Sequence, residues 1–193
     1  MKRLCVFTGS SSGSRIEYAG AARELGQALV RRDVGLVYGG ARVGLMGVLA
    51  DAVLAGQGHV TGVIPEALLA REVAHEGLSD LRVVASMHER KAVMASLADG
   101  FMALPGGWGT LEELFEVLTW AQLGLHRKPC GLLNVRGYFD GLLSFMEHSI
   151  DEGFVRREHH AMVIVSSSPD ALLDRFDEHV PPAVTKWIGE AET

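Results

Sequence analysis

The chain has 193 residues, of which 48% are hydrophobic and 22% are charged, values typical of one globular domain with a single substantial core. The formal net charge of −6 argues against a non-specific nucleic-acid binder, since such proteins are usually basic. No apolar run approaches the roughly 20 residues of a membrane span, and the first apolar segment is too short for a signal peptide. Two cysteines, Cys5 and Cys130, are too few for a disulfide framework. We therefore expect a cytoplasmic protein with two buried thiols and neither a nucleic-acid nor a membrane partner.

Short apolar, β-branched runs alternate along the chain with longer stretches of helical period. The predicted strands are residues 4–9, 35–40, 59–65, 81–86, 101–106, 130–135 and 161–167. The predicted helices are residues 15–32, 44–56, 87–99, 110–124, 138–152 and 169–179, the last with Ser168 as N-cap and Pro169 in its first turn. Strands that are apolar throughout indicate a parallel sheet covered on both faces. The prediction is an α/β fold: one Rossmann-like, doubly wound domain over residues 1–180 with a mainly parallel sheet of about seven strands, followed by a C-terminal tail, 181–193.

Three glycine-rich segments each follow a predicted strand and precede a predicted helix. They are TGSSSGS after the first strand, YGGARVGLMG after the second and LPGGWGT after the fifth. Ligands of a doubly wound sheet bind at the carboxyl ends of its strands, so we expect these loops to share one edge. Glycine lets backbone N–H groups approach an anion, and the following helix directs its positive end there. The candidate phosphate- or ribose-binding residues are Gly9, Ser10, Gly39, Gly40, Gly44, Gly107, Gly109 and Thr110.

The segment LPGGWGTLEEL has two interpretations. Its Thr-Leu-Glu-Glu run matches a capping box, with Thr110 as N-cap and Glu113 at the third helical position. The same positions can instead aim backbone donors, a hydroxyl and a carboxylate at a ligand. A capping box leaves Gly-Gly-Trp-Gly unexplained, because one turn glycine suffices. We predict that the segment does both, so that Glu113 leaves its capping position in order to act on the ligand.

The segment SMHERKAVMASLAD, residues 86–99, places two cations on the apolar stripe of a predicted helix. At 3.6 residues per turn, Arg90 and Lys91 fall on the same stripe as Met87 and Met94. Two alternatives stand: the cations reach past the helix end into water or pair with a structural acid, or they bind an anionic ligand. A guanidinium at this edge of the sheet suits a phosphate or carboxylate, which it binds through two parallel hydrogen bonds.

Other chemistries fit the sequence less well. YGGARVGLMG is not a dinucleotide fingerprint, since that motif belongs to the first strand–helix turn. His159 and His160 are adjacent, are expected in an exposed turn, and have no acid or cysteine nearby that completes a metal site. GSSSGS lacks the G-x-S-x-G elbow and the placed histidine of a serine nucleophile. The sequence therefore predicts neither a metal nor a cofactor.

Taken together, SMHERKAVM and LPGGWGTLEEL resemble the paired motifs of the LONELY GUY family, cytokinin riboside 5′-monophosphate phosphoribohydrolases long labelled "lysine decarboxylase-like". The resemblance covers nearly the whole chain and includes GSSSG, YGG-x-x-x-GLMG, VIP and RKPCGLLN. Two residues depart from it: Thr8 and Trp108 stand where many members carry Cys and Tyr, and Trp108 bears on base preference. The resemblance implies a homodimer or larger homo-oligomer with helices at its interface.

The resemblance also implies roles for individual residues. Arg90 and Glu113 match the catalytic pair of the two motifs. The residues that fall in nucleotide-binding stretches or match substrate contacts are Lys91, Gly107, Gly109, Thr110, Glu112, Glu72 and Thr119. Without the resemblance, Glu112 and Glu116 are expected to line a solvated helix face.

The reaction implied is cleavage of the N-glycosidic bond of a nucleoside 5′-monophosphate, AMP or N6-modified AMP, to a free base and ribose 5-phosphate. Positive charge builds on C1′ and the ring oxygen as the base leaves, so an ionised Glu113 can stabilise it or orient water. A guanidinium is always protonated in proteins, which makes Arg90 a fixed donor rather than an acid. The alternatives are an AMP nucleosidase and a non-catalytic carrier of a nucleotide or the molybdenum cofactor. A pyridoxal phosphate decarboxylase needs a Schiff-base lysine, for which Lys91 is the sole candidate.

Overall fold

The computed structural model describes residues 1–69 and 74–181. Within them the strands are β1 (Arg3–Phe7), β2 (Gly35–Tyr38), β3 (Val60–Pro65), β4 (Asp80–Val84), β5 (Gly100–Ala103), β6 (Cys130–Leu133) and β7 (Val163–Ser166). The longer helices are α1 (Ile16–Arg31), α2 (Gly44–Ala55), α4 (Met87–Leu97), α5 (Trp108–Gln122), α6 (Asp140–Asp151) and α8 (Pro169–Asp177). Each of these strands and helices was predicted. The short helices α3 (Glu66–Leu69) and α7 (Arg157–His160) and the 3-10 turn Val135–Gly137 were not.

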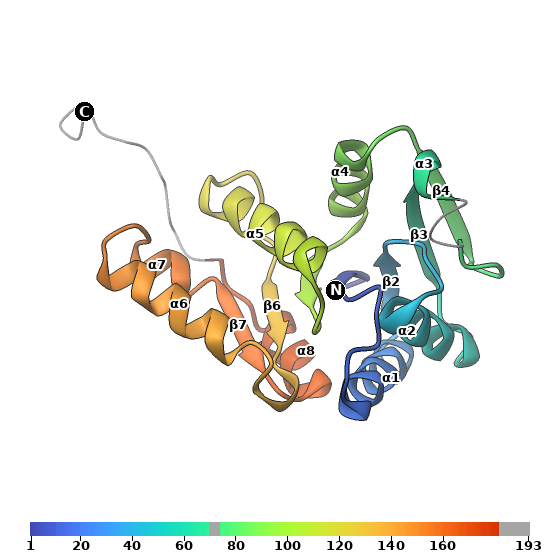
Figure 1. The fold of residues 1–193 in the computed structure, drawn as a ribbon, viewed down its shortest axis with the longest axis horizontal. Helices are drawn as coiled ribbons and strands as arrows, with labels where there is room; N and C mark the ends of the chain where they lie inside the picture. The colour runs from blue at the N-terminus through green and yellow to red at the C-terminus, as the bar shows by residue number, and fades with distance from the viewer. Residues whose placement is uncertain (70–73, 182–193) are drawn as a thin grey trace.

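The strands form one sheet in the order β4-β3-β2-β1-β5-β6-β7, and all neighbouring strands pair in parallel. From β1 the chain first winds to the β4 edge and then returns to β5 and winds to the β7 edge. Figure 1 shows helices on both sides of this sheet. The predicted Rossmann-like, doubly wound α/β fold is thereby confirmed.

Two apolar layers enclose the sheet, one on each face. Because successive strand residues point to opposite faces, Leu4 and Val6 pack with α1, α2 and α8, whereas Cys5 and Phe7 pack with α4, α5 and α6. All residues of Leu4–Phe7 are buried. In a central strand covered on both faces, no side chain contacts water, which explains the uninterrupted apolar run in the sequence.

Two local predictions are confirmed in this fold. Cys5 and Cys130 are free, buried thiols, and burial raises the pKa of both, that of Cys130 to about 12. α8 begins as predicted: Pro169 is its first residue, and the Ser168 hydroxyl accepts a hydrogen bond from the Ala171 N–H at 3.4 Å. The start of α8 follows from a local pattern, whereas the two thiols are buried because their strands lie inside the sheet.

The division of the chain into a domain, 1–180, and a tail, 181–193, stays a prediction, because residues 182–193 lie outside the described part. Within residues 1–69 and 74–181, no helix is both long and apolar enough to cross a bilayer.

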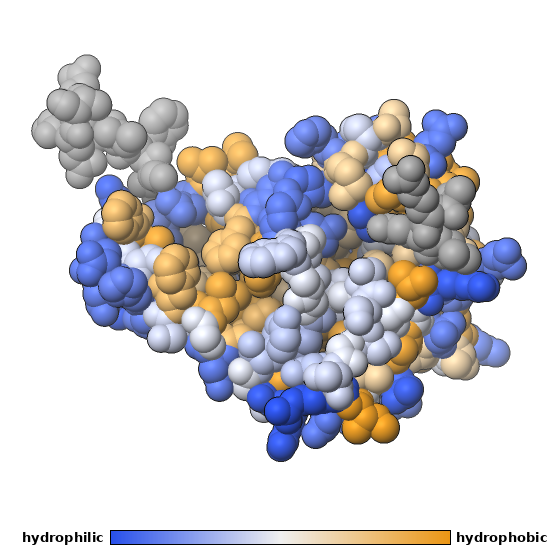
Figure 2. Space-filling model, in the orientation of Figure 1, coloured by the Kyte–Doolittle hydropathy of each residue, from blue (hydrophilic) through white to orange (hydrophobic). Residues whose placement is uncertain are grey.

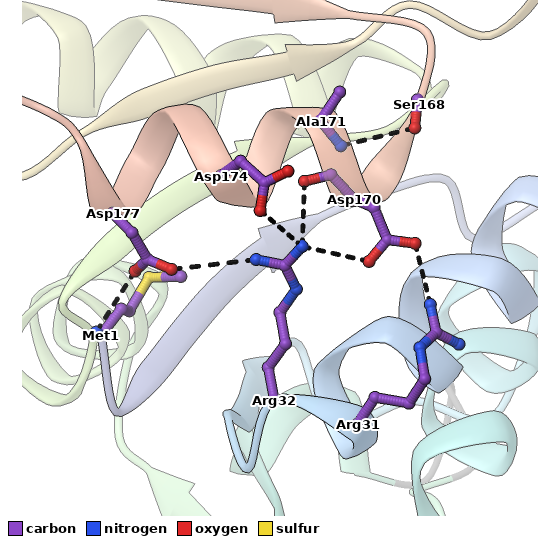
Figure 3. Close-up of polar contacts among 8 residues, drawn as sticks. All are labelled: Met1, Arg31, Arg32, Ser168, Asp170, Ala171, Asp174 and Asp177. Atoms are coloured by element: carbon purple, nitrogen blue, oxygen red, sulfur yellow. Dashed lines mark hydrogen bonds and ion pairs between the residues drawn. The ribbon is translucent and has the colours of Figure 1, made fainter.

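An ion-pair cluster fastens the end of α1 to α8 (Figure 3). The guanidinium of Arg32 lies 3.2 Å from Asp170, 2.7 Å from Asp174 and 3.8 Å from Asp177, measured to carboxylate oxygens. Its side chain is 25% exposed, so the charge is partly removed from water. The cluster joins parts of the chain that are 138 or more positions apart.

Replacing Arg32 with Leu is expected to lower the free energy of unfolding by about 1–2 kcal/mol, because three carboxylates lose their common partner and repel one another. Arg31→Leu is the matched control: Arg31 is 57% exposed and contacts Asp170 at 2.8 Å, so a loss of about 0–0.5 kcal/mol is expected. Urea unfolding measures both variants, and the Arg32 effect should shrink in about 1 M salt. Equal losses in the two variants would contradict the role given to the cluster.

Candidate active site

A crevice opens at the carboxyl ends of β1 and β5. These strands are neighbours, and the chain leaves them towards opposite edges of the sheet, so their loops diverge (Figure 1). A cavity of about 280 Å³ lies there. It is lined by the loop after β1, by Pro105, Gly106 and Gly107 after β5, and by Tyr138.

Backbone contacts hold the three glycine-rich loops together. The N–H of Gly9 donates to the Pro105 carbonyl at 3.2 Å, and the N–H of Leu45 donates to the Gly9 carbonyl at 3.0 Å. Gly44 has a φ of +56°, and a Cβ there would overlap the backbone of Ser10. Gly44 thus lets the second loop close onto the first. The predicted contacts of Gly9, Ser10 and Gly44 with phosphate or ribose stay predictions.

α5 begins two residues earlier than predicted, at Trp108 rather than Thr110. Gly107 is its N-cap, and no side chain in the described part of the protein caps the helix. The capping box is therefore wrong: Thr110 is buried inside the first turn, and Glu113 has no capping position to leave. The glycine run turns the chain directly from β5 into the helix, and Gly109 faces open space. The amides of that first turn lack acceptors within the helix and are suited to an anion.

The guanidinium of Arg90 is buried at the ends of β2 and β3. Only 6% of Arg90 is exposed; Nε donates to the Val63 carbonyl at 3.1 Å and Nη2 to the Gly39 carbonyl at 3.0 Å. Nη1 lies 3.8 Å from the Met87 sulfur. A Cβ on Gly39 would overlap Nη2, so only glycine leaves room for the guanidinium. Arg90 therefore does not reach past the helix end into water, and its guanidinium packs directly against Gly39. A phosphate or ribose contact of Gly39 stays a prediction.

Glu113 lies close enough to Arg90 for the two charges to interact. Its side chain is partly buried, and this loss of water raises the pKa of the carboxyl from 4.5 to about 7. The positive charges of Arg90 and Lys91 oppose the rise, while the negative charges of Glu112 and Glu116 add to it. Desolvation outweighs the attraction of Arg90. The carboxyl therefore exchanges its proton near neutral pH, the range that suits proton transfer.

Lys91 bridges α4 to α5. Its Nζ lies 2.5 Å from a carboxylate oxygen of Glu112 and 3.0 Å from one of Glu116. Burial lowers the pKa of Lys91, but the bonds to Glu112 and Glu116 outweigh it and leave the pKa raised. Lys91 was expected either to reach water, to pair with a structural acid or to bind a ligand, and the structure shows it paired with acids. Glu112 and Glu116 are ion-paired rather than merely solvated, and nucleotide contacts of Lys91 and Glu112 stay predictions.

The remaining predicted residues are spread over the site and beyond it. Ser10 is exposed and lines the crevice cavity. Gly40, with a φ of +80°, packs against β3. Thr119 donates its hydroxyl to the Phe115 carbonyl at 2.7 Å and lines a separate hollow of about 120 Å³ between α5, α6 and α7. Glu72 lies outside the described residues, and the substrate contacts expected for these residues stay predictions.

Two further residues belong to the site, although sequence reasoning did not identify them. Tyr138 follows the sixth strand, and its hydroxyl donates to the Gly106 carbonyl at 2.6 Å. The Arg-Gly turn signal just before it, ending at Gly137, could have drawn attention to this connection. Met87 was assigned to a buried stripe, yet it is 42% exposed, and its sulfur contacts the Arg90 guanidinium.

The prediction of an exposed turn at His159 and His160 is wrong: both residues lie on the helix α7, and the His160 side chain is only 25% exposed. His159 is 7% exposed on α7, where it borders the apolar hollow with Thr119. The short helix folds this residue inwards. Among residues 1–69 and 74–181, no three His, Cys, Asp or Glu side chains are grouped to hold a metal ion.

The fold and the site together define a Rossmann-like α/β protein with a glycine-lined crevice, a buried Arg90 and a partly buried Glu113 within range of its charge. The family model described as "Possible lysine decarboxylase" matches residues 46–176. Cytokinin riboside 5′-monophosphate phosphoribohydrolase LOG1 of Arabidopsis thaliana is 51% identical over 180 residues, which are 93% of this chain and 84% of LOG1. LOG of Oryza sativa subsp. japonica, named for the same activity, is also 51% identical, over 93% of this chain and 74% of its own length. The chain belongs to the LONELY GUY family.

Solved structures of lower sequence identity share the fold. The molybdenum cofactor binding protein of Rippkaea orientalis has a TM-score of 0.70 and 20% identity over 92% of this chain and 97% of its own. The Moco carrier protein of Chlamydomonas reinhardtii has a TM-score of 0.69 and 19% identity over 92% of this chain and 96% of its own. At this identity the likeness concerns the fold alone.

The raised pKa of Glu113 predicts a pH-dependent cost to stability. The unfolded carboxyl ionises near pH 4.5 and the folded one near pH 7, so the folded state binds more protons between these values. Relative to Glu113→Gln, the free energy of unfolding should fall by about 2–3 kcal/mol as the pH rises from about 4.5 to about 8. Urea unfolding of both proteins across this range measures the difference. A difference that does not change with pH would contradict the raised pKa.

Proposed function

We propose that the protein hydrolyses the N-glycosidic bond of a nucleoside 5′-monophosphate, either AMP or an N6-modified AMP of the cytokinin type. The products are the free base and ribose 5-phosphate, and the reaction uses neither a metal nor a cofactor. The observation that carries the proposal is a fixed, buried guanidinium, that of Arg90, near Glu113, a carboxyl with a pKa of about 7. Both belong to a site that includes a glycine-lined crevice. The names of the relatives that share half of its residues support the same chemistry.

The substrate is held by its phosphate. In this proposal the 5′-phosphate binds the free amides at the start of α5 and the loops that line the crevice. Glu113 lies in the next turn of the same helix, so a ribose attached to that phosphate is brought towards its carboxyl. Binding energy from the phosphate, which takes no part in bond cleavage, then positions the reacting carbon.

Hydrolysis adds the oxygen of water to C1′ and leaves a proton on the departing base. As the C1′–N bond lengthens, positive charge spreads over C1′ and the ring oxygen. The ionised Glu113 stabilises this charge and accepts one proton from the attacking water as the hydroxyl adds to C1′. That proton then passes, directly or through solvent, to the nitrogen of the departing base. Arg90 donates hydrogen bonds to the phosphate, ribose or leaving base. Because Val63 and Gly39 already hold the guanidinium, little reorganisation is needed during the reaction.

The alternatives fit this site less well. A carrier of a nucleotide or the molybdenum cofactor needs the loops but gains nothing from a carboxyl that titrates near neutral pH. A pyridoxal phosphate decarboxylase needs a neutral lysine amine, whereas Lys91 is held as an ammonium by Glu112 and Glu116. An AMP nucleosidase differs only in the base that leaves. Trp108, 89% exposed at the start of α5, stands where such a preference can be set.

The proposal includes assembly into a homodimer or larger homo-oligomer. Figure 2 shows apolar side chains gathered on the left of this face, over α5 and α6. The exposed apolar residues of this region include Phe115, Leu123, Phe145 and Phe154. A second copy placed here would remove them from water. The mass of a single chain, 20.8 kDa, in light scattering would reject this part of the proposal.

Glu113→Gln should bind nucleotide and lose turnover by about 100-fold or more, since the amide can neither accept a proton nor balance the charge on C1′. Reverse-phase chromatography of the base released from AMP and from isopentenyladenosine monophosphate measures it. Glu178→Gln, an exposed change at the end of α8, is the control. Faster release of the isopentenylated base assigns the cytokinin substrate, and release of adenine alone assigns an AMP nucleosidase. Binding without release by the parent protein would contradict the proposal.

Gly39→Ala should lower turnover by about 10- to 100-fold although the residue bears no side chain of its own. The new methyl group overlaps Nη2, so the Arg90 guanidinium must leave its two carbonyl partners. Gly20→Ala in α1 is the matched control, because a Cβ there has no neighbour within 4 Å. The same chromatographic assay, with melting temperatures recorded alongside, tests the pair. Unchanged turnover in Gly39→Ala would show that the position of Arg90 does not matter.

A further inference from the structure

The connection between β6 and α6 is a turn whose conformation is fixed by side-chain hydrogen bonds. Arg136 has a φ of +55°, a left-handed conformation that a non-glycine residue keeps only when its surroundings hold it. Side chains at both ends supply that support: Asn134 accepts a hydrogen bond from the Phe139 N–H at 2.8 Å and donates one to Asp140 at 2.7 Å. The turn therefore has one fixed shape.

This turn places Tyr138 against the loop that enters α5. The Tyr138 hydroxyl donates to the Gly106 carbonyl at 2.6 Å. Its ring packs edge-to-face on Tyr18, with centroids 5.6 Å apart, and on the buried Phe139, with centroids 5.0 Å apart. The side chain is nevertheless 42% exposed, because its remaining surface lines the crevice cavity. It is held in place and also reaches the site.

The chemistry of the phenol decides what Tyr138 can do there. A tyrosine hydroxyl has one proton to donate, and this one is given to the Gly106 carbonyl. The group has no second proton with which to bind a phosphate. Tyr138 can therefore serve the crevice by fixing the peptide it contacts.

That peptide is the point from which α5 starts. Gly107, the next residue, is the N-cap of α5, and a Cβ on Gly107 would meet no atom within 4 Å. Pro105, on the other side, is held by Gly9, whose N–H donates to its carbonyl at 3.2 Å. The bond from Tyr138 thus restrains the last stretch before the helix, where glycine provides no side-chain packing of its own.

We propose that Tyr138 is a positioning residue for substrate phosphate: its hydroxyl fixes the Gly106 peptide and thereby the first amides of α5. The inference rests on the proposed function, because the phosphate belongs to the nucleotide of that proposal. The residue contributes through Gly106, and it acts on substrate binding rather than on the bond that breaks.

Tyr138→Phe tests this role, since it removes the hydroxyl and keeps the ring. We expect KM for AMP to rise about tenfold and kcat to change less than twofold, and inhibition by inorganic phosphate to weaken in the same proportion. Tyr18→Phe is the comparison variant: Tyr18 lines the same cavity and forms the other half of the edge-to-face pair, but the hydroxyl that bonds Gly106 is that of Tyr138. An equal rise in KM in the two variants, or a fall in kcat and melting temperature without a rise in KM, would overturn the proposal.

Calorimetric titration with AMP in a Glu113→Gln background separates this proposal from the proposed function. A Kd raised about tenfold by Tyr138→Phe supports the positioning role even if the parent protein releases no base, an outcome that would defeat hydrolysis alone. An unchanged Kd overturns the role of Tyr138 while leaving hydrolysis intact. Failure of AMP to bind the Glu113→Gln protein would overturn both.

Discussion

The parallel pairing of β1 with β5 is the constraint on which the site depends. These strands are paired from Leu4 with Gly100 to Phe7 with Ala103, so they end at the same level. Their chain connections run to opposite edges, and neither helix covers the gap between them. The bond from Gly9 to Pro105 sets the width of that gap at the backbone. The loops that follow both strands line the crevice cavity, so the space open to a ligand depends on these two strand ends.

The second constraint is the balance of charge and water around Glu113. Arg90 attracts the carboxylate, and this attraction alone would lower the pKa of Glu113. The pKa is instead raised, to about 7, because the loss of water on burial disfavours the ionised carboxyl more than the charge of Arg90 favours it. Arg90 acts on Glu113 through its charge, while its Nε and Nη2 donate to the carbonyls of Val63 and Gly39. The guanidinium is therefore fixed by backbone oxygens, and the carboxyl keeps a pKa set mainly by its loss of water.

Sequence periodicity was sufficient for the fold because each buried strand and each amphipathic helix carries its own signal. It was insufficient at the start of α5, where Thr-x-x-Glu satisfies the capping pattern whether Thr110 is the cap or the third helical residue. The apolar stripe on α4 was enough to predict that Arg90 is buried, but not to predict which groups accept its hydrogen bonds. Val63 and Gly39 lie 27 and 51 positions away, and their backbone carbonyls have no residue-specific signature. Tyr138 was missed for the same reason, since its partner is a backbone carbonyl 32 positions away.

The neighbouring cations of α4, Arg90 and Lys91, show how one turn of a helix can serve two purposes. A rotation of about 100° separates Arg90 from Lys91, which is enough to direct one towards the strand ends and the other towards α5. Lys91 binds Glu112 and Glu116, residues one turn apart on α5, and so ties the two helices together. Those helices carry Arg90 and Glu113 respectively. The ion pairs of Lys91 therefore help to set the distance between guanidinium and carboxyl, and a residue that the sequence placed among the ligands also builds the frame that holds the pair.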